Sequence, residues 1–351
     1  GFDCADKSYY IDTTDKESLL KVAKKEEIDG IVTTGSDVAV SSIGYICEKL
    51  GLPGMSGYTA DIVTDKALFR EKMNGVIHTP KSFKLDLDST DIDVSSHLPC
   101  MLKVVDSSGS RGVYKVYTIN DFFNYLNDAK RYTHKNYVIL EDIIVGEEIG
   151  CEAIICNKKI IGIFPHKKIV TTAKTDIPVG HIFPSYFAPE ILNEINEQMS
   201  RAISELEIVS GLVNADIIIS SGKAYIIDFG ARCGATGIPE IISESTESNL
   251  YEVILRLALG EGVDEYSWRP RRIAASQLLT SNVDGYIKDQ RIVGDLDQHT
   301  KIQFDYNVGD YVEKFQTGQQ RIGMIVCTAD SEIQAISKIS NVRNLIHITV
   351  D

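Results

Sequence analysis

The sequence predicts a mixed α/β and α+β protein with more than one domain. Three observations lead to this prediction. Strand-like and helix-like patterns alternate over residues 1–60, a small α+β pattern occupies about 98–150, and a strand-rich part covers 263–351. Alternating strands and helices are typical of a parallel α/β architecture. A chain of 351 residues is long enough for two or three domains with buried cores.

The expected elements follow the apolar periodicity of each segment. In the first domain, residues 1–60, Asp15 caps one helix and Gly51 closes another. This domain lacks the usual opening strand and glycine-rich turn, so we expect it to be incomplete. A middle domain is expected over 61–262, with a small subdomain at about 98–150, and a C-terminal domain over 263–351. The expected strands cover 8–13, 29–35, 98–105, 112–117, 137–144, 150–165, 212–220, 223–230 and 345–350, and the expected helices 15–27, 38–51, 64–75, 118–132, 190–208, 248–260 and 330–341.

The formal net charge of −14 argues against nucleic acid or an anionic membrane as the main partner, because both select for basic surfaces. No run approaches the roughly 20 apolar residues of a membrane span, and no signal peptide is visible. The seven cysteines contain no C-x-x-C and lie mostly in apolar runs, so we expect reduced, buried thiols in a cytoplasmic protein. Cys233 is either a small core residue or a reactive thiol. A homodimer is the default oligomer.

A glycine-rich loop joins two predicted strands near Lys103. Residues 106–112 hold two glycines and three serines, and the backbone N–H groups of such a loop can cradle phosphate oxygens. Lys103 and Arg111 add positive charge. A solvated hairpin turn would have the same composition, so the loop alone leaves both interpretations open.

Acidic residues follow the strand predicted over 137–144. Glu141 and Asp142 end that strand, and Glu148 lies just after Gly146. Carboxylates accept hydrogen bonds from the hydroxyls and the amine of a nucleoside. The alternative is a solvated acidic turn.

Asp216 and Asp228 lie on two apolar strands that the turn at 220–223 joins. If these strands pair, both carboxylates can face one side, where Mg²⁺ could bind them together with substrate phosphates. Two facing acids without a cation would repel each other.

Two further features are less specific. Lys66 begins a helix and would usually be a solvated surface residue. Residues 166–185 hold two histidines and three lysines with few helix or strand signals, so we expect a long irregular loop with a functional role. The histidine spacing does not match a structural zinc site.

The order and spacing of these motifs resemble the ATP-grasp superfamily, and most of all its carboxylate–amine ligase branch. That branch includes L-amino-acid ligases, the large subunit of carbamoyl-phosphate synthetase, and biotin carboxylase. The resemblance rests on "DKALF", "LPCMLKVV" with its loop, "LEDIIVGEE" and "NADIII…YIIDFGAR", and it covers most of the chain. It implies an ATP-grasp fold with an N-terminal α/β domain, a small lid subdomain and a strand-rich C-terminal domain.

The resemblance also assigns roles to residues. Lys66 and Lys103 would bind the phosphates of ATP, and Asp216 and Asp228 would hold Mg²⁺, or Mn²⁺ in its place. Arg232 would face the substrate carboxylate and the transferred phosphoryl group, so Arg232 and Lys103 are the expected catalytic residues. The other expected ATP contacts are Ser107, Ser108, Gly109 and Gly112 in the lid loop, Glu141 and Ile144 at the adenine, and Glu148 at the ribose. The expected substrate contacts are His181, Arg232 and Glu240, although Glu240 is equally well explained as an acid at a helix N-terminus.

The implied function is an ATP-dependent ligase that joins a small carboxylic acid, such as an amino acid, to an amine through an acyl phosphate. ADP and phosphate would be released. The sequence departs from the family pattern Glu-x-Asn-x-Arg, because it has Asp228, Gly230 and Arg232 at these positions. Gly230 lacks the side-chain oxygen of a third metal ligand, so one Mg²⁺ should be more hydrated or more weakly held. This departure keeps open an alternative, a nucleotide-binding regulatory or partner subunit without ligase activity.

Overall fold

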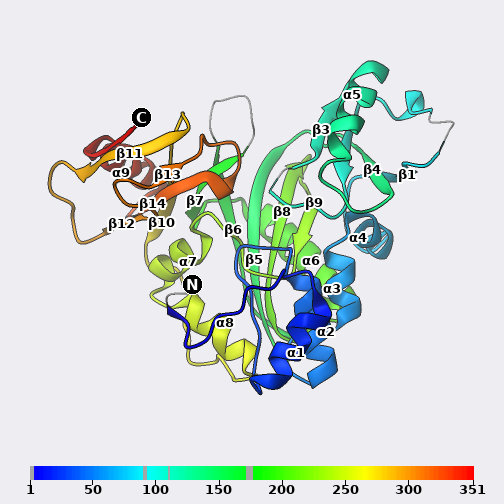
Figure 1. The fold of residues 1–351 in the computed structure, drawn as a ribbon, viewed down its shortest axis with the longest axis horizontal. Coiled ribbons are helices and arrows are strands. Elements are labelled where there is room, and N and C mark those ends of the chain that lie inside the picture. Colours follow the sequence, from blue (N-terminus) through cyan, green and yellow to red (C-terminus); the bar gives the residue numbers. More distant parts are fainter. Residues whose placement is uncertain (1–3, 90–92, 110, 171–176) are drawn as a thin grey trace.

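The computed structural model describes residues 4–89, 93–109, 111–170 and 177–351, and its centre is an eight-stranded sheet (Figure 1). Its strands are β5 (Glu147–Cys156), β6 (Lys159–Val170), β7 (Pro178–Phe183), β8 (Gly211–Ser220), β9 (Lys223–Gly230), β10 (Ile273–Thr280), β12 (Thr300–Phe304) and β14 (Arg321–Ala329). The strand order is β12-β14-β10-β7-β6-β5-β8-β9, and all neighbouring strands are antiparallel. Three strands of the expected C-terminal domain therefore extend the sheet of the middle domain.

Both faces of this sheet contribute to a hydrophobic core, because successive side chains of a strand point to opposite faces. In β5, Cys151 and Ala153 contribute to the core under α6, whereas Ile154 contributes to the core under α7 and α8. The helices on the two faces are α6 (Pro189–Glu205), α7 (Ile238–Thr246) and α8 (Leu250–Ala258). Buried on two sides, the strands form a rigid floor on which polar residues at the strand ends can be positioned.

The predicted small α+β unit is a four-stranded sheet in the order β1-β4-β2-β3, covered by one helix. Phe122 and Leu126 of that helix lie in the core of the unit, and Thr118 begins the helix with a capping box to Asp121. Its elements are β1 (Ser82–Asp86), the short 3-10 helix η2 (Ser95–His97), β2 (Cys100–Val104), β3 (Val113–Val116), α5 (Ile119–Ala129) and β4 (Tyr137–Asp142). This unit stands beside the N-terminal helices, at the β9 end of the central sheet (Figure 1).

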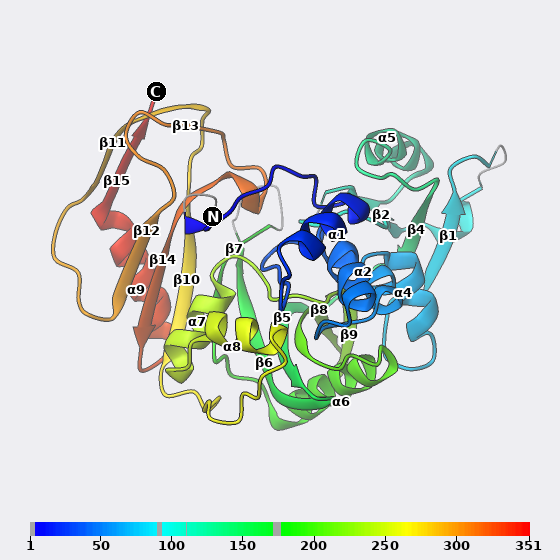
Figure 2. The ribbon, with the colours of Figure 1, turned by 60° about the horizontal axis from the view of Figure 1, so that its bottom comes forward.

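The C-terminal part adds a small sheet and a helix at the opposite side of the molecule (Figure 2). The sheet has the order β13-β11-β15, and the helix packs against β14 and β10. The elements are β11 (Gly285–Ile292), β13 (Tyr311–Val312), the 3-10 helix η3 (Gly318–Gln320), α9 (Glu332–Leu345) and β15 (Ile346–Val350).

The N-terminal part contains helices α1 (Lys16–Lys25), α2 (Val40–Leu50), α3 (Gly57–Val63) and α4 (Lys66–Met73). Asp15 caps α1 through the Ser18 N–H, and Gly51 ends α2 with a positive φ of 68°, as predicted. The strands predicted over 8–13 and 29–35 are wrong, because a strand needs a neighbour to receive its hydrogen bonds. Thr34 makes only an isolated parallel bridge, to Cys233.

The long irregular loop predicted over residues 166–185 is also wrong. Within it, β6 continues to Val170 and pairs with β7, so that Lys168 lies opposite His181. Polar residues that line a cleft interrupt the alternation of apolar and polar residues by which a strand is recognised in a sequence. Residues 171–176 of the segment lie outside the described part. In the ranges that the structure describes, no helix is long and apolar enough to cross a membrane.

Candidate functional site

A cleft of about 2550 Å³ lies between the small α+β unit, which is the predicted lid subdomain, the central sheet and the N-terminal helices. Residues from every part of the chain line it, including Asp37, Lys103, Asp228 and Arg321. All the predicted site residues line this cleft: Lys66, Lys103, Ser107, Ser108, Gly109, Gly112, Glu141, Ile144, Glu148, His181, Asp216, Asp228, Arg232 and Glu240. The sequence therefore identified groups that folding brings to one place.

Asp216 and Asp228 are directly opposite each other in the β8–β9 hairpin, as predicted. Each carboxylate has a lysine partner. Lys168 Nζ donates to Asp216 Oδ1 at 2.6 Å, and Lys66 Nζ lies 3.4 Å from Asp228 Oδ1. Partial burial opposes ionisation of Asp228, but the charges of Lys66 and Lys103 outweigh it and lower the pKa of this carboxyl. Each of the two carboxylates therefore has a lysine charge beside it that offsets its negative charge.

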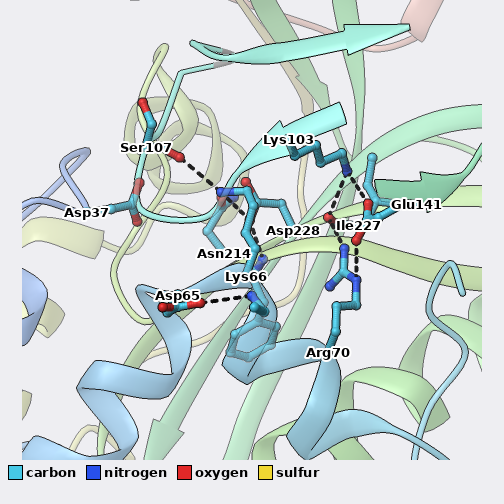
Figure 3. A network of polar contacts seen from close by, with 12 residues as sticks. Asp37, Asp65, Lys66, Arg70, Lys103, Ser107, Glu141, Asn214, Ile227 and Asp228 are labelled. Atoms are coloured by element: carbon cyan, nitrogen blue, oxygen red, sulfur yellow. Dashed lines mark hydrogen bonds and ion pairs between the residues drawn. The ribbon is translucent and has the colours of Figure 1, made fainter. Parts of the chain in front are cut away.

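Lys66 is positioned by the start of α4. Asp65 caps this helix through the N–H groups of Ala67 and Leu68, and the Lys66 N–H donates to the Val105 carbonyl at 3.0 Å. The Lys66 ammonium then reaches the Ser107 carbonyl in the glycine-rich loop at 3.0 Å (Figure 3). Lys66 is not the solvated surface residue that a lone lysine at a helix start would usually be. It joins the Asp228 carboxylate to the glycine-rich loop.

Glu141 has different neighbours from those that its expected adenine contact requires. Its carboxylate is 1% exposed and accepts a hydrogen bond from Arg70 Nε at 2.6 Å, while Lys103 Nζ lies 2.7 Å away (Figure 3). Burial alone would raise the pKa of Glu141, but the charges of Arg70 and Lys103 outweigh it and lower this pKa. Glu141 therefore fixes Lys103 at the wall of the cleft, and its contact with adenine stays a prediction.

The glycine-rich loop has the backbone that close approach to a ligand needs. Gly109 has φ 66° and Gly112 has φ 71°, both in the left-handed region that favours glycine. A Cβ at Gly112 would lie 2.7 Å from a methyl group of Val104, so this position also requires glycine for space. Ser110 lies outside the described residues.

Ile144 follows β4 and Glu148 lies in β5, and both line the cleft, where a nucleoside is expected. Lys168 Nζ donates to Glu148 Oε1 at 2.7 Å and so links the predicted ribose contact to Asp216. Burial would lower the pKa of Lys168, but these two carboxylates outweigh it and raise the pKa to about 12. Lys168 is a charged member of the site that the sequence analysis missed.

Arg232 forms a two-bond ion pair with Asp37, a residue 195 positions away. Arg232 Nε donates to Asp37 Oδ1 at 2.9 Å, and Nη2 donates to Asp37 Oδ2 at 2.7 Å. Nη1 donates to the Asn214 side chain at 3.3 Å and to the Cys233 carbonyl at 3.2 Å. Burial would lower the pKa of Arg232, but Asp37 outweighs it and raises this pKa further, so the guanidinium is permanently charged.

The predicted substrate contacts His181 and Glu240 line the same cleft. His181 is 4% exposed, and its Nδ1 lies 3.1 Å from Nδ1 of His166. Burial, His166 and Lys168 lower the pKa of His181, so its imidazole is neutral. Glu240 lies in the first turn of α7 and accepts a hydrogen bond from the Tyr251 hydroxyl at 2.7 Å. Both explanations of Glu240, substrate contact and helix N-terminal acid, fit this place.

Cys233 is buried and belongs to the core under α7 and α8. Burial and the nearby Glu152 raise the pKa of its thiol well above the ordinary value. A thiol with a raised pKa carries little thiolate, so the structure favours the core residue over the reactive thiol.

The residues that sequence analysis missed are Asp37, Arg70, His166, Lys168 and Asn214. Arg70 gave a weak signal, because it lies one helical turn after Lys66 and so shares its face of α4. Asn214 precedes the predicted site residue Asp216 on β8, and Lys168 lies opposite the predicted site residue His181 in the β6–β7 pair. Asp37 gave no signal, since it lies in the loop before α2.

Comparisons with known proteins find relatives that share this fold. The model of the ATP-grasp domain matches residues 96–240. Two carbamoyl phosphate synthase large chains match: that of Clostridium botulinum is 22% identical over 292 residues, and that of Thermoanaerobacter pseudethanolicus is 24% identical over 282 residues. The matches cover 80% and 76% of this chain, but only 27% and 25% of the relatives. The chain thus spans about a quarter of the length of these curated relatives.

Solved structures share the whole fold. Phosphoribosylglycinamide synthetase from Anaerococcus prevotii has a TM-score of 0.82 at 22% identity, covering 100% of this chain and 90% of that one. L-amino acid ligase from Bacillus licheniformis has a TM-score of 0.77 at 19% identity, covering 96% and 85%. The biotin carboxylase domain of Hydrogenobacter thermophilus 2-oxoglutarate carboxylase, solved with MgADP, has a TM-score of 0.79 at 16% identity, covering 99% and 82%. The chain therefore has the ATP-grasp fold, its residues 96–240 match the ATP-grasp domain, and the predicted resemblance is confirmed.

Proposed function

We propose that this protein is an ATP-dependent ligase that joins a small carboxylic acid to an amine. The observation that carries the proposal is the grouping of Lys66, Lys103, Asp216, Asp228 and Arg232 in one cleft. This set supplies cations for a triphosphate and for a carboxylate, together with two anionic ligands for a metal ion. An amino acid is the favoured acid, because an L-amino acid ligase shares the fold.

In the proposed reaction, an oxygen of the substrate carboxylate attacks the γ-phosphorus of ATP, and ADP leaves. The amine nitrogen then attacks the acyl carbon of the resulting acyl phosphate, the C–O bond breaks, phosphate leaves and the nitrogen loses a proton. The protein contributes positioning and charge neutralisation in such a phosphoryl transfer. Lys66 and Lys103 would bind the phosphates, and Arg232 would stabilise charge at the transferred group.

Asp216 and Asp228 fit a divalent cation, because Mg²⁺ usually binds one or two carboxylates and completes its coordination with phosphates and water. The two carboxylates are opposite each other and line the cleft. Bound Mg²⁺, or Mn²⁺, would neutralise charge on the phosphates. Lys66 would then exchange its contact with Asp228 for the phosphates.

The experiment is a phosphate-release assay with ATP, Mg²⁺ and a panel of amino acids and amines. We expect phosphate release that depends on both substrates, and trapping of the acyl phosphate as a hydroxamate when hydroxylamine replaces the amine. Asp228→Asn and Arg232→Ala should abolish turnover, whereas Glu197→Gln should not, because Glu197 lies in an exposed ion pair of α6 with Arg201. Undiminished turnover in either site variant would remove that residue from the mechanism.

A nucleotide-binding subunit without ligase activity is the second candidate, and Gly230 favours it, because this position lacks the third metal ligand of the family pattern. Calorimetry separates the two candidates. Binding of Mg·ATP without phosphate release from any substrate pair would support the second candidate and contradict the first.

We also propose a cytoplasmic protein that forms a homodimer. The support is that a structure with this fold is described as a domain dimer. Light scattering on the purified chain tests the dimer, and a mass near the monomer's 38.9 kDa would contradict it.

A further inference from the structure

Gly230 and Asp37 are neighbours in the cleft although they lie in different parts of the chain. We infer that Asp37 is a positioning residue that fixes Arg232 for catalysis, and that position 230 is glycine because the Asp37 carboxylate fills the adjacent space. The catalytic part of this inference rests on the proposed function. On this inference, the side chain that the family pattern has at position 230 is not simply lost, because the Asp37 side chain takes its place.

The loop before α2 holds Asp37 in place. The Gly35 N–H donates to the Cys233 carbonyl at 3.0 Å, and Thr34 pairs with Cys233 in a parallel bridge. The Asp37 carbonyl accepts a hydrogen bond from the Val40 N–H at 3.0 Å, at the start of α2. The N-terminal part is therefore attached to the segment after β9, beside the residue that Asp37 binds.

Steric exclusion links Asp37 to Gly230. A Cβ built on Gly230 would lie 2.8 Å from Asp37 Oδ1, closer than real Cβ contacts. The same Cβ would lie 3.7 Å from Arg232 Nε. A side chain at position 230 would thus compete with Asp37 for the space beside the guanidinium.

The ion pair determines how Arg232 can act. A guanidinium has five N–H donors. Nε and Nη2 each donate to Asp37, and Nη1 donates to Asn214 and Cys233, so one N–H of Nη2 is left over among the contacts of the described residues. The edge that usually binds a carboxylate with two bonds is occupied. Arg232 is therefore a fixed cation with a single donor for a ligand.

A fixed cation stabilises charge that develops in the transition state without having to reorganise, so its effect falls on kcat. Without Asp37, the guanidinium could rotate and bind the substrate carboxylate in the ground state. Asp37→Ala should therefore lower kcat by about 100-fold, the loss that a displacement of roughly 1 Å can cause. The KM for ATP should change by less than about threefold, since Lys66 and Lys103 bind the phosphates. Asp37→Asn keeps one acceptor oxygen and should lose less.

An exchange of side chains separates positioning from a general structural role. Gly230→Asn alone should lower kcat, because the new side chain collides with Asp37. In the double variant Asp37→Gly with Gly230→Asn, the amide oxygen of Asn takes the place of the carboxylate, and kcat should recover at least tenfold over Asp37→Gly. If Asp37 only attaches the N-terminal part, the two losses will multiply instead, and the inference fails. Glu197→Ala is the matched control, because it removes the carboxylate from an exposed arginine pair.

A spectroscopic readout keeps the test independent of ligase activity. In ¹⁵N NMR spectra, the Nε–H of Arg232, assigned by its loss in Arg232→Lys, should be protected from exchange in the wild type. It should exchange rapidly in Asp37→Ala and regain protection in the double variant. If the wild type shows no turnover, the proposed function fails. The exchange rate of the Arg232 Nε–H then tests by itself whether Asp37 fixes Arg232. Protection that persists in Asp37→Ala would overturn the inference.

Discussion

At the scale of single residues, the site is built from charges that depend on one another. Glu141 lies between Arg70 and Lys103, and Arg70 Nη2 also donates to the Ile227 carbonyl at 2.5 Å. A buried ion is costly unless it is paired. Removal of the one carboxylate would leave two cations below the cleft, which makes Glu141 the most sensitive member of the group.

The first prediction concerns Glu141→Gln. We expect the free energy of unfolding at pH 7 to fall by about 3–5 kcal/mol, the usual loss when a buried ion pair is broken. The pKa of Glu141 is lowered in the folded state, so its stabilisation is fully present above the ordinary pKa of 4.5 and is lost as pH falls through the lower folded value. The difference from wild type should therefore shrink in acid.

Urea unfolding at pH 7 and at pH 4 measures both effects. Glu197→Gln is the control, because an exposed pair contributes about 1 kcal/mol or less. A loss for Glu141→Gln as small as that of the control would show that the buried group does not depend on this carboxylate.

The limits of sequence reasoning are also visible at this scale. Asp216 and Asp228 could be paired in advance, since a short turn between two apolar strands fixes their register. Arg70 and Glu141 lie 71 residues apart, and Asp37 and Arg232 lie 195 apart. No local period links such residues, so these partners could not be predicted from one sequence.

At the scale of elements, the joint between β7 and β10 connects the ATP-grasp strands to the C-terminal strands. Gly180 of β7 faces the backbone of β10, and a Cβ there would lie 2.0 Å from the Ser276 carbonyl oxygen. Backbone cannot rotate away as a side chain can, so only glycine fits at this position.

The second prediction is that Gly180→Ala separates these strands. We expect a loss of about 2 kcal/mol or more, because overpacking in a core typically costs 1–3 kcal/mol and here the clash is with backbone. Gly262→Ala is the matched control, since its Cβ would meet nothing within 4 Å, and it should change stability by less than about 0.5 kcal/mol. Thermal melting of both variants is the measurement. Equal melting temperatures would mean that the strands move apart at little cost.

Elements were predicted well where local signals are strong. Asp15 and Gly51 mark the ends of α1 and α2, and the apolar runs of β8 and β9 are unmistakable. The strand β7 was missed because Pro178, Gly180 and His181 are not typical strand residues. A neighbouring strand on each side nevertheless provides its hydrogen bonds. Tertiary pairing, which the sequence does not display, decides such segments.

At the scale of the whole molecule, the cysteines report on folding. Six of the seven are buried, and Cys4 is exposed. Burial raises the pKa of Cys47 to about 11 and raises those of Cys151 and Cys233 as well. A reagent therefore lacks access to the six buried thiols, and Cys47, Cys151 and Cys233 also carry less thiolate than a free cysteine.

The third prediction follows from this difference. In the native protein, one thiol should react rapidly with a thiol reagent at pH 8, and the other six should react only after unfolding. Cys4→Ser should remove the fast phase. Titration with the thiol reagent in the absence and presence of urea counts the thiols that react in the native and in the unfolded protein. A second thiol that reacts rapidly in the native protein would contradict the burial of the remaining six.

The fourth prediction uses the cleft as a connection between the parts of the chain. Its lining includes Asp37 from the N-terminal part, Asp228 from the central sheet and Arg321 from the C-terminal part, so a bound nucleotide should stabilise all three together. Mg·ATP at about 100 times its Kd should add roughly 2.7 kcal/mol to the free energy of unfolding. Since 1 kcal/mol shifts Tm by about 2–4 °C in domains of 150–250 residues, a rise of several degrees is expected.

Thermal unfolding of wild type, Asp228→Asn and Glu197→Gln tests this prediction. Asp228→Asn should lose most of the rise with Mg·ATP, because it removes one of the two carboxylates proposed to bind Mg²⁺, while ATP without Mg²⁺ should affect it and the wild type alike. Glu197→Gln should keep the full rise. A shift of equal size in all three proteins would mean that the nucleotide binds elsewhere, and no shift in the wild type would mean that the cleft does not hold Mg·ATP. Only metal-dependent stabilisation that Asp228 controls agrees with a nucleotide bound at the β8–β9 hairpin.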